Sequence, residues 1–309
     1  MLYPLKFKPF FLPKVWGSET WTLSDYGEYR SEVAEGILQG NTLSELVEIY
    51  MDELVGNSVF QQYGNKFPLL FKTIDAQDNL SIQVHPDDNY ASRVQQSGKT
   101  EMWYVTHAQH GADIVMGFNR QTNAEEIASR LESDTIMDVL QLVPVHVGDV
   151  AFITPGCVHA LRRGTQVAEI QQTSDMTYRL YDYQRPGLDG KLRPLHVKDS
   201  LAVLNYSHLE QPLVHYDNRL NMATNLVRDT YFTTNKLRFN TIIGRDYAAL
   251  DSFVVYMCVE GQVTITAEEP DIQPVEMKAG ETVLIPACIN DIRLTPHKEE
   301  ATFLEIYIQ

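Results

Sequence analysis

Gln83 and His85 lie two residues apart in the apolar stretch LSIQVHPDD, residues 80–88. Alternate side chains of a strand point to the same face, so the amide and the imidazole would share one face. Burying two polar groups costs free energy unless a partner satisfies them. Glu101, in GKTEMWYV, and His159, in TPGCVHAL, supply a further carboxylate and a further imidazole. Imidazole, carboxylate and amide oxygen all bind divalent cations, so these four residues predict a metal site.

The segments around these residues are typical of a mainly β protein. Short runs rich in β-branched and aromatic residues, bounded by glycine, proline or asparagine, recur along the chain as DIVMGF, GDVAFITPG and ETVLIPA. Many short strands at this spacing favour a jelly-roll sandwich or barrel. In such a fold, neighbouring antiparallel strands bring residues that are distant in the sequence to about 5 Å from one another on one inner face. A jelly roll could therefore assemble the predicted metal site.

Two segments with a helical pattern interrupt the strands. NTLSELVEIYMDEL opens with a capping box from Thr42 to Glu45, and TNAEEIASRLES opens with one from Thr122 to Glu125. Both segments carry apolar residues three and four positions apart, the spacing of one helical face. We therefore expect a short helix over each of them.

An internal repeat organises the chain. GDVAFITPGCVHALR is similar to GETVLIPACINDIRL, and MWYVTHAQHGADIVMGF is likewise similar to VVYMCVEGQVTITA. The repeat predicts two copies of one barrel, which we place at residues 1–205 and 206–309. The second copy has Asn290 where the first has His159, and it offers no counterpart for the other polar pair. We therefore expect a metal-binding first unit and a degenerate second unit without metal ligands.

Charge and composition limit the partners. The chain has 309 residues, 25 Lys and Arg against 41 Asp and Glu, and a formal net charge of −16, which argues against nucleic acid or an anionic membrane as partner. A small anionic substrate is compatible, because a few local cations can outweigh the global charge. Neither a signal-peptide pattern nor an apolar run of the roughly 18 residues that span a bilayer is apparent. Three widely spaced cysteines predict a reduced, cytoplasmic protein without disulfides. The oligomeric state leaves no mark on the sequence.

These motifs resemble known families. GKTE, the P-x-G-x-x-H pattern of TPGCVHAL and the preceding polar pair together resemble the cupin superfamily. FPLLFKTIDAQDNLSIQVHPDD and SDMTYRLYDYQR are similar to the type I mannose-6-phosphate isomerases, in their short bacterial form, and the likeness covers nearly the whole chain. The resemblance implies two cupin-type jelly-roll barrels with a few short helices. It also implies one Zn²⁺ per chain, held by Gln83, His85, Glu101 and His159.

The resemblance implies a reaction as well, the interconversion of mannose 6-phosphate and fructose 6-phosphate. In this reaction a proton moves between C1 and C2 through an enediol(ate), which needs an acid, a base and an electrophile. Arg179 matches the family's active-site arginine, and Asp175 falls on a family acid proposed for proton transfer. Lys99 lies two residues before Glu101 and would share its strand face, where a nearby dication is expected to lower the lysine pKa. Whether Lys99, Asp175 or a metal-bound water takes the proton is left open.

The substrate's phosphate group would need its own donors. By resemblance these are Ser81, which would share the strand face of Gln83, together with Lys72 and Arg185. Other family members commonly carry lysine at the position of Arg185, and either cation suits a dianion.

Two alternatives stay open at this point. Two histidines and one carboxylate also describe a non-haem iron site, so the chain could be a cupin dioxygenase. It could also be a non-catalytic cupin that binds a sugar phosphate. Gln83 as a fourth ligand, Lys99 and the pair Arg179 and Arg185 favour a sugar-phosphate substrate over the apolar substrate of an oxygenase.

Overall fold

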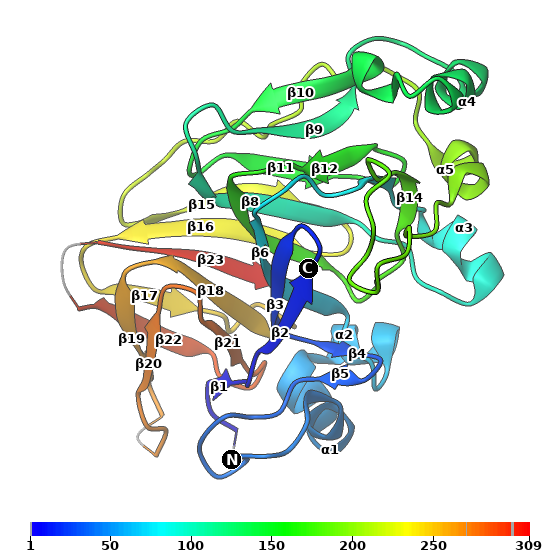
Figure 1. Ribbon diagram of the computed structural model, residues 1–309. Helices are drawn as coiled ribbons and strands as arrows, with labels where there is room; N and C mark the ends of the chain where they lie inside the picture. The colour runs from blue at the N-terminus through cyan, green and yellow to red at the C-terminus, as the bar shows by residue number, and fades with distance from the viewer. Residues whose placement is uncertain (1, 270, 298–299) are drawn as a thin grey trace. The chain divides into compact units, whose positions relative to one another are not determined.

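A computed structural model describes residues 2–269, 271–297 and 300–309 of the chain (Figure 1). Strands make up most of its regular structure, and short helices are set between them. The strands assemble into antiparallel sheets in two jelly-roll sandwiches, so the predicted mainly β fold with two barrels is confirmed.

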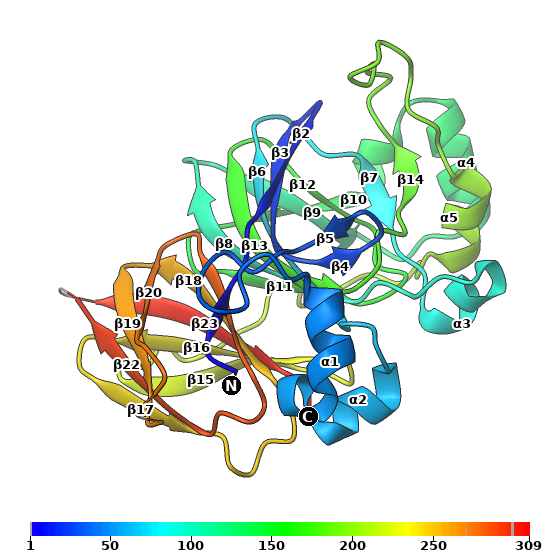
Figure 2. The same ribbon diagram turned by 90° about the horizontal axis from the view of Figure 1, so that it is seen from below.

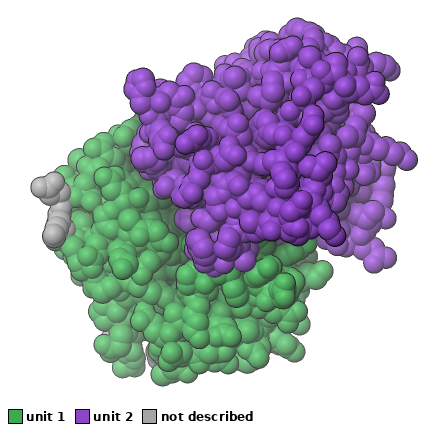
Figure 3. Space-filling view, in the orientation of Figure 1, with its two compact units in different colours: residues 1–10, 21–70, 215–309 green, residues 11–20, 71–214 purple. Residues whose placement is uncertain are grey.

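The chain forms two compact units, which Figure 3 shows in green and purple. Unit 1 comprises residues 1–10, 21–70 and 215–309, and unit 2 comprises residues 11–20 and 71–214. The predicted metal ligands all belong to unit 2.

Unit 2 is built on two sheets. One has the strand order β11 (Val150–Ile153), β8 (Glu101–Ala108), β13 (Thr165–Gln172), β6 (Leu69–Ala76), β3 (Gly17–Leu23) and β2 (Phe10–Lys14). The other has the order β10 (Leu140–Pro144), β9 (Asp113–Phe118), β12 (His159–Leu161), β7 (Ile82–Val84) and β14 (Tyr178–Tyr181). Its helices are α3 (Asp88–Ala91), α4 (Ala124–Glu132) and α5 (Val197–Val203). Figures 1 and 2 show α4 and α5 next to each other, on the side of the five-stranded sheet where β14 lies.

Strand β7 separates an apolar face from a polar one, as its alternating sequence predicts. Ile82 and Val84 are fully buried in a cluster that includes Ile127 of α4 and Leu180 of β14. Successive strand residues point to opposite faces, so Gln83 is directed away from this cluster and into the barrel. The helices therefore cover the outer face of the sheet and leave its inner face for the polar residues.

Unit 1 repeats this architecture. Its larger sheet has the order β1 (Leu5–Lys6), β21 (Thr282–Ile285), β18 (Val254–Glu260), β23 (Ala301–Tyr307), β16 (Thr233–Phe239) and β15 (Met222–Arg228). Its smaller sheet has the order β17 (Ile243–Asp246), β22 (Asp291–Pro296), β19 (Gln262–Ala267) and β20 (Val275–Lys278). The remaining elements are β4 (Asp25–Tyr26), β5 (Tyr29–Arg30), α1 (Leu43–Val55) and α2 (Asn57–Tyr63). The order β11-β8-β13-β6 corresponds to β21-β18-β23-β16, and β10-β9-β12-β7 corresponds to β20-β19-β22-β17, so the predicted internal repeat is present in the topology.

The interior of unit 1 holds an ion pair between Arg245 and Glu305. Glu305 is fully buried, and its Oε1 accepts from Arg245 Nε at 2.7 Å and from the Tyr247 hydroxyl at 2.5 Å. Arg245 comes from β17, the strand that corresponds to β7. A guanidinium and a phenol therefore donate hydrogen bonds to this buried carboxylate, whereas two imidazoles lie beside the buried carboxylate of Glu101 in unit 2.

The two units divide the chain differently from the expected boundary between residues 205 and 206. Strand β1 pairs with β21, and the backbone N–H of Phe253 and Ala287 donate to the carbonyl oxygens of Val55 and Leu54. These bonds tie the N-terminal strand and helix α1 to the C-terminal barrel. Pairing between chain ends is a long-range property, so a boundary drawn at the end of one repeat did not anticipate it.

The helix starts were predicted with mixed success. Thr42 caps α1 in a capping box with Glu45, as expected. Helix α4 begins one residue later than expected, because the side chain of Asn123 accepts the N–H of Glu126 at 2.9 Å. The predicted capping box from Thr122 is therefore wrong; the Thr122 hydroxyl donates to the Glu126 carboxylate instead.

Two expectations from composition can be compared with the structure. Cys157, Cys258 and Cys288 are all free thiols, in agreement with the absence of a disulfide framework. Within the described part of the chain, no helix combines the length and the apolar character that crossing a membrane requires.

Candidate metal centre and adjoining pocket

Three predicted ligands meet inside unit 2. His85 follows β7, Glu101 opens β8 and His159 opens β12, and all three are buried. The Nε2 atoms of the two imidazoles are 3.1 Å apart, and they lie 3.6 Å and 3.3 Å from the nearer Glu101 carboxylate oxygens. Among the described residues, this is the group of histidine, cysteine and acidic side chains arranged closely enough to hold a metal ion.

The outer nitrogens of the two rings fix which atoms face this centre. Nδ1 of His85 lies 2.8 Å from the carbonyl oxygen of Met176, and Nδ1 of His159 lies 2.9 Å from that of Cys157. A carbonyl oxygen can only accept, so each Nδ1 carries the hydrogen, and in the neutral ring Nε2 keeps its lone pair. Burial, followed by the charge of Lys99, lowers the pKa of His85 to about 3. At neutral pH the His85 imidazole is therefore uncharged, and its Nε2 can donate a lone pair to a metal ion.

The donor set fits a divalent cation. Two imidazole lone pairs and a carboxylate within 3.6 Å of one another repel unless positive charge lies among them. Glu101 Oε1 is buried and has no hydrogen-bond partner in the described part of the chain. Carboxylate oxygen and imidazole nitrogen are common ligands of zinc and of other first-row divalent metals.

Gln83 lies beside this group. It is the β7 residue directly opposite His159 in the ladder between β7 and β12, and opposite Arg179 in the ladder between β7 and β14. Its side chain lines a pocket that Lys99, the ion-pair partner of Glu101, also lines. Gln83 therefore lies on the strand next to the one that carries His159, and its role as a fourth ligand stays a prediction.

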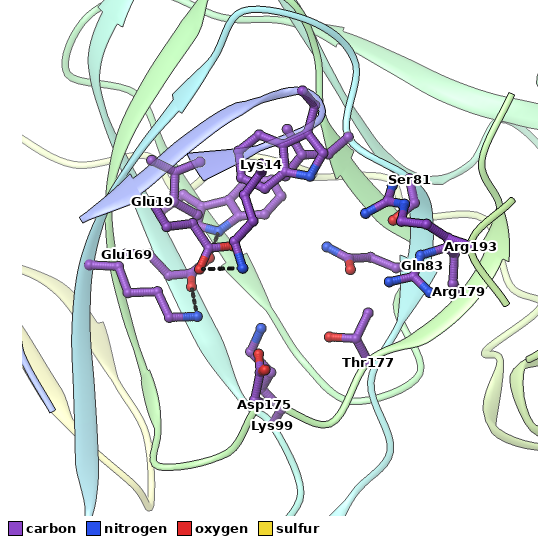
Figure 4. A pocket seen from close by; sticks show the side chains of 15 residues that line it. Lys14, Glu19, Ser81, Gln83, Lys99, Glu169, Asp175, Thr177, Arg179 and Arg193 are labelled. Carbon is purple, nitrogen blue, oxygen red and sulfur yellow. Dashed lines mark hydrogen bonds and ion pairs between the residues drawn. The ribbon is translucent and has the colours of Figure 1, made fainter. Parts of the chain in front are cut away.

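The pocket has a volume of about 210 Å³ and a strongly polar lining (Figure 4). Six predicted site residues line it: Lys72, Ser81, Gln83, Lys99, Asp175 and Arg179. Arg185 is not among the lining residues. Polar or charged lining residues that the sequence analysis did not single out are Lys14, Glu19, Glu169, Thr177 and Arg193. The charged lining side chains are five cations and three carboxylates, which favours an anionic ligand although the chain is acidic as a whole.

Lys99 links the pocket to the metal ligands. Its Nζ lies 2.9 Å from Glu101 Oε2, and both side chains are buried. Burial acts to lower the pKa of Lys99, but the carboxylates of Glu101, Glu169 and Asp175 outweigh burial and raise it. The protein groups thus favour the charged ammonium, and the lowering of the Lys99 pKa by a bound dication stays a prediction.

A second buried ion pair lies in the pocket wall. Lys72 Nζ is 3.2 Å from Glu169 Oε1, and the indole Nε1 of Trp103 donates to Glu169 Oε2 at 2.7 Å. Burial and then the charge of Glu101 raise the pKa of Glu169, while Lys72 and Lys99 oppose this rise. Glu169 lies in the apolar run TQVAEIQQ of β13. A carboxylate in an apolar strand is the same signal that identified Gln83 and His85, so this residue could have been found from the sequence.

Arg179 faces the pocket from β14. Its Nη1 donates to the carbonyl oxygen of Pro194 at 2.9 Å, and its backbone is bonded on both sides to His196. Burial and the charge of Arg193 lower the pKa of Arg179. Its buried Nε has no hydrogen-bond partner among the described residues, so the guanidinium keeps a donor for a ligand.

The chain is similar to known proteins along nearly its whole length. Residues 16–99 match the family model for the type I phosphomannose isomerase catalytic domain. The mannose-6-phosphate isomerase ManA of Bacillus subtilis (strain 168) is 34% identical over 316 residues, which cover 96% of this chain and 97% of the relative. A crystal structure of the mannose 6-phosphate isomerase from Bacillus subtilis matches with a TM-score of 0.88 and 28% identity, over 99% of this chain and 100% of that one. A zinc-bound mannose 6-phosphate isomerase structure shares the fold, with a TM-score of 0.78 and 14% identity over the full length of both chains.

Proposed function

The chain belongs to the type I mannose-6-phosphate isomerase family, and we propose that it interconverts mannose 6-phosphate and fructose 6-phosphate. One observation carries the proposal. The buried group of His85, Glu101 and His159 is linked, through the ion pair of Glu101 with Lys99, to a pocket in which cationic side chains outnumber carboxylates. A metal-ligand set beside an anion-attracting pocket suits a metal-dependent reaction of a sugar phosphate.

We propose that the ion is Zn²⁺, one per chain, held by His85, Glu101 and His159 with the amide oxygen of Gln83. The mixed nitrogen and oxygen donor set supports this choice, as does the zinc bound to a structurally similar isomerase. When bound, such an ion acts as a Lewis acid that polarises a sugar oxygen.

The chain's own residues would bind the substrate and move its protons. The Asp175 carboxylate lines the pocket and can accept a proton from a sugar carbon. The Lys99 ammonium and the Arg179 guanidinium face the same pocket and can donate hydrogen bonds to the oxygen on which negative charge develops. These are the catalytic roles that we propose for Asp175, Lys99 and Arg179.

The phosphate would be held away from the metal ligands. Ser81 and Lys72 line the pocket and are proposed donors, although Lys72 is also paired with Glu169. Arg185 stays a prediction as a phosphate ligand. A cytoplasmic location, and the absence of nucleic-acid and membrane partners, likewise stay predictions from the composition of the chain.

A coupled assay tests the proposed function. The zinc-loaded protein should convert mannose 6-phosphate to fructose 6-phosphate, dialysis against a chelator should abolish the activity, and added Zn²⁺ should restore it. If a fully loaded protein gives no turnover but still binds the sugar phosphate, the protein is a binding protein. Oxygen consumption by the iron-loaded protein would instead identify a cupin dioxygenase.

A further inference from the structure

Two arginines share the buried carboxylate of Asp182, which follows β14, and only one of them lines the pocket. Arg193 reaches Asp182 with Nε at 2.6 Å and Nη2 at 2.5 Å, and Arg185 reaches it with the same two nitrogens at 3.2 Å and 3.0 Å. Arg193 is a lining residue, and Figure 4 shows it near Ser81 and Arg179. We propose that Arg193 binds the phosphate group of the substrate and that Asp182 positions it, an inference that rests on the proposed function.

The hydrogen-bond donors of the two arginines are used differently. Arg185 also directs Nη1 toward Asp78 Oδ2, at 3.4 Å, and its guanidinium carbon lies 5.6 Å from the ring centre of Tyr183. All three of its nitrogens thus face carboxylates. Arg193 uses Nε and Nη2 for Asp182, and no described residue accepts a hydrogen bond from its Nη1. Arg193 therefore has donors left for a ligand, whereas Arg185 is occupied by protein groups.

The local charges favour an anion at this place. Two carboxylates, Asp182 and Asp78, pair with the guanidinium groups of Arg185 and Arg193, and a third guanidinium, that of Arg179, faces the pocket. The repulsion between Arg179 and Arg193 contributes to the lowered pKa of Arg179. A phosphate dianion would relieve this repulsion, and arginine donates to phosphate in a planar, two-pronged geometry.

The segment that follows Arg193 is also held in place. The N–H of His196 donates to the carbonyl oxygen of Arg179 at 2.8 Å, and Arg179 Nη1 donates to the carbonyl oxygen of Pro194 at 2.9 Å. The segment that carries Arg193 is therefore tied to β14 on one side, while Asp182 holds the side chain itself. Such preorganisation reduces the ordering cost of ligand binding.

Three variants separate the roles of these cations. Arg193→Met should raise KM for mannose 6-phosphate by about 10- to 100-fold, the range expected for a lost charge-assisted hydrogen bond, while kcat changes less than about 3-fold. Arg185→Met should raise KM less than Arg193→Met does. Lys191→Met is the matched control, because this exposed cation lies two residues from Arg193 and does not line the pocket. Its KM should stay within about 2-fold of the wild-type value.

A binding measurement makes the test independent of turnover. Inorganic phosphate is titrated calorimetrically into each zinc-loaded variant, and its Kd should rise in Arg193→Met by a factor similar to the rise in KM. Arg193→Lys keeps the charge and should recover part of the affinity even if the methionine variant folds poorly. Asp182→Asn keeps the size of the side chain but loses the charge that orients Arg193, and should raise KM without abolishing turnover.

The outcomes are distinguishable from a failure of the proposed function. If Arg193→Met keeps the wild-type KM and phosphate Kd, or if Arg185→Met raises KM at least as much, the inference is overturned. If the wild-type protein lacks isomerase activity, the proposed function fails, and the phosphate titration still decides the role of Arg193. Weaker phosphate binding in Arg193→Met then supports the anion site, and an unchanged Kd refutes it.

Discussion

Replacing Lys72 by methionine should destabilise the fold in a way that depends on pH. Lys72 Nζ lies 3.2 Å from Glu169 Oε1, and the two side chains are only 3% and 4% exposed. Removing one member of a buried ion pair leaves the other charge without compensation and typically costs about 3–5 kcal/mol. Methionine keeps most of the packing volume, and Trp103 still donates to Glu169. We therefore expect Lys72→Met to lower the free energy of unfolding by about 3 kcal/mol at pH 7.

The pH dependence separates this electrostatic effect from a loss of packing. Burial and Glu101 already raise the pKa of Glu169, and the charge of Lys72 is one of the influences that lower it. Without Lys72 the folded-state pKa of Glu169 rises further. A carboxyl group with a raised folded-state pKa stabilises the fold at a pH below its unfolded pKa, which is about 4.3 for glutamate. This stability is lost as the pH rises through the folded-state pKa. The deficit of the variant should thus be large at pH 7 and above and shrink towards pH 4.

Urea unfolding of the metal-loaded variants between pH 5 and pH 8 measures this deficit. Lys8→Met is a matched control, because Lys8 forms an exposed pair with Glu32 at 2.9 Å and should cost less than about 1 kcal/mol. The double variant Lys72→Met/Glu169→Gln removes both charges and should regain much of the lost stability. A Lys72→Met deficit below about 1 kcal/mol at pH 7, or one that does not change with pH, would refute the reasoning.

Three further predictions follow from the described contacts. His159→Ala removes one of three converging ligands and should lower the zinc content measured by atomic emission; unchanged zinc would exclude His159 as a ligand. Arg179→Ala should keep its fold and its zinc but lose at least about 100-fold in kcat in the coupled assay, whereas near-normal turnover would contradict the proposed role. Asp251→Ala removes the acceptor for the N–H groups of Asn57 and Ser58 at the start of α2 and should cost about 1 kcal/mol at pH 7. The hydrogen bonds from Ser58 and Asn57 lower the pKa of Asp251, so this stability is present above the unfolded pKa and lost as the pH falls through the folded-state pKa. A difference between wild type and Asp251→Ala in urea unfolding that persists in strong acid would contradict this account.

The fold class could be predicted because it depends on local patterns of alternation and turns, and the metal ligands could be proposed because imidazole, carboxylate and amide side chains stand out in apolar strands. Alternation along β7 put Ile82 and Val84 in an apolar cluster and left Gln83 on the other face. The repeat of strand and turn residues anticipated the matching strand orders of the two units. The Nε2 atoms of His85 and His159 lie 3.1 Å apart, and the role of the two residues as ligands stays a prediction.

Other features were not accessible because they depend on contacts between distant segments. Arg193 lies in the loop RPGLDGKLRPL, which has no regular pattern, and its place in the pocket wall follows from the carboxylate of Asp182 eleven positions earlier. The grouping of the N-terminal helices with the C-terminal barrel likewise depends on strand pairing across most of the chain. The start of α4 is a local case: Asn123, and not the adjacent Thr122, is the N-cap, and the spacing of the residues alone does not decide between the two.

The central claim is that this chain, with a divalent ion at His85, Glu101 and His159, isomerises a sugar phosphate. Proton NMR of mannose 6-phosphate with the zinc-reconstituted protein tests this claim most directly, with the apo-protein and a Glu101→Gln variant as references. We predict that fructose 6-phosphate signals grow to equilibrium with the zinc-loaded protein, while both references leave the substrate unchanged or nearly so. An unchanged mannose 6-phosphate spectrum, from protein shown to hold one zinc ion per chain, would contradict the account.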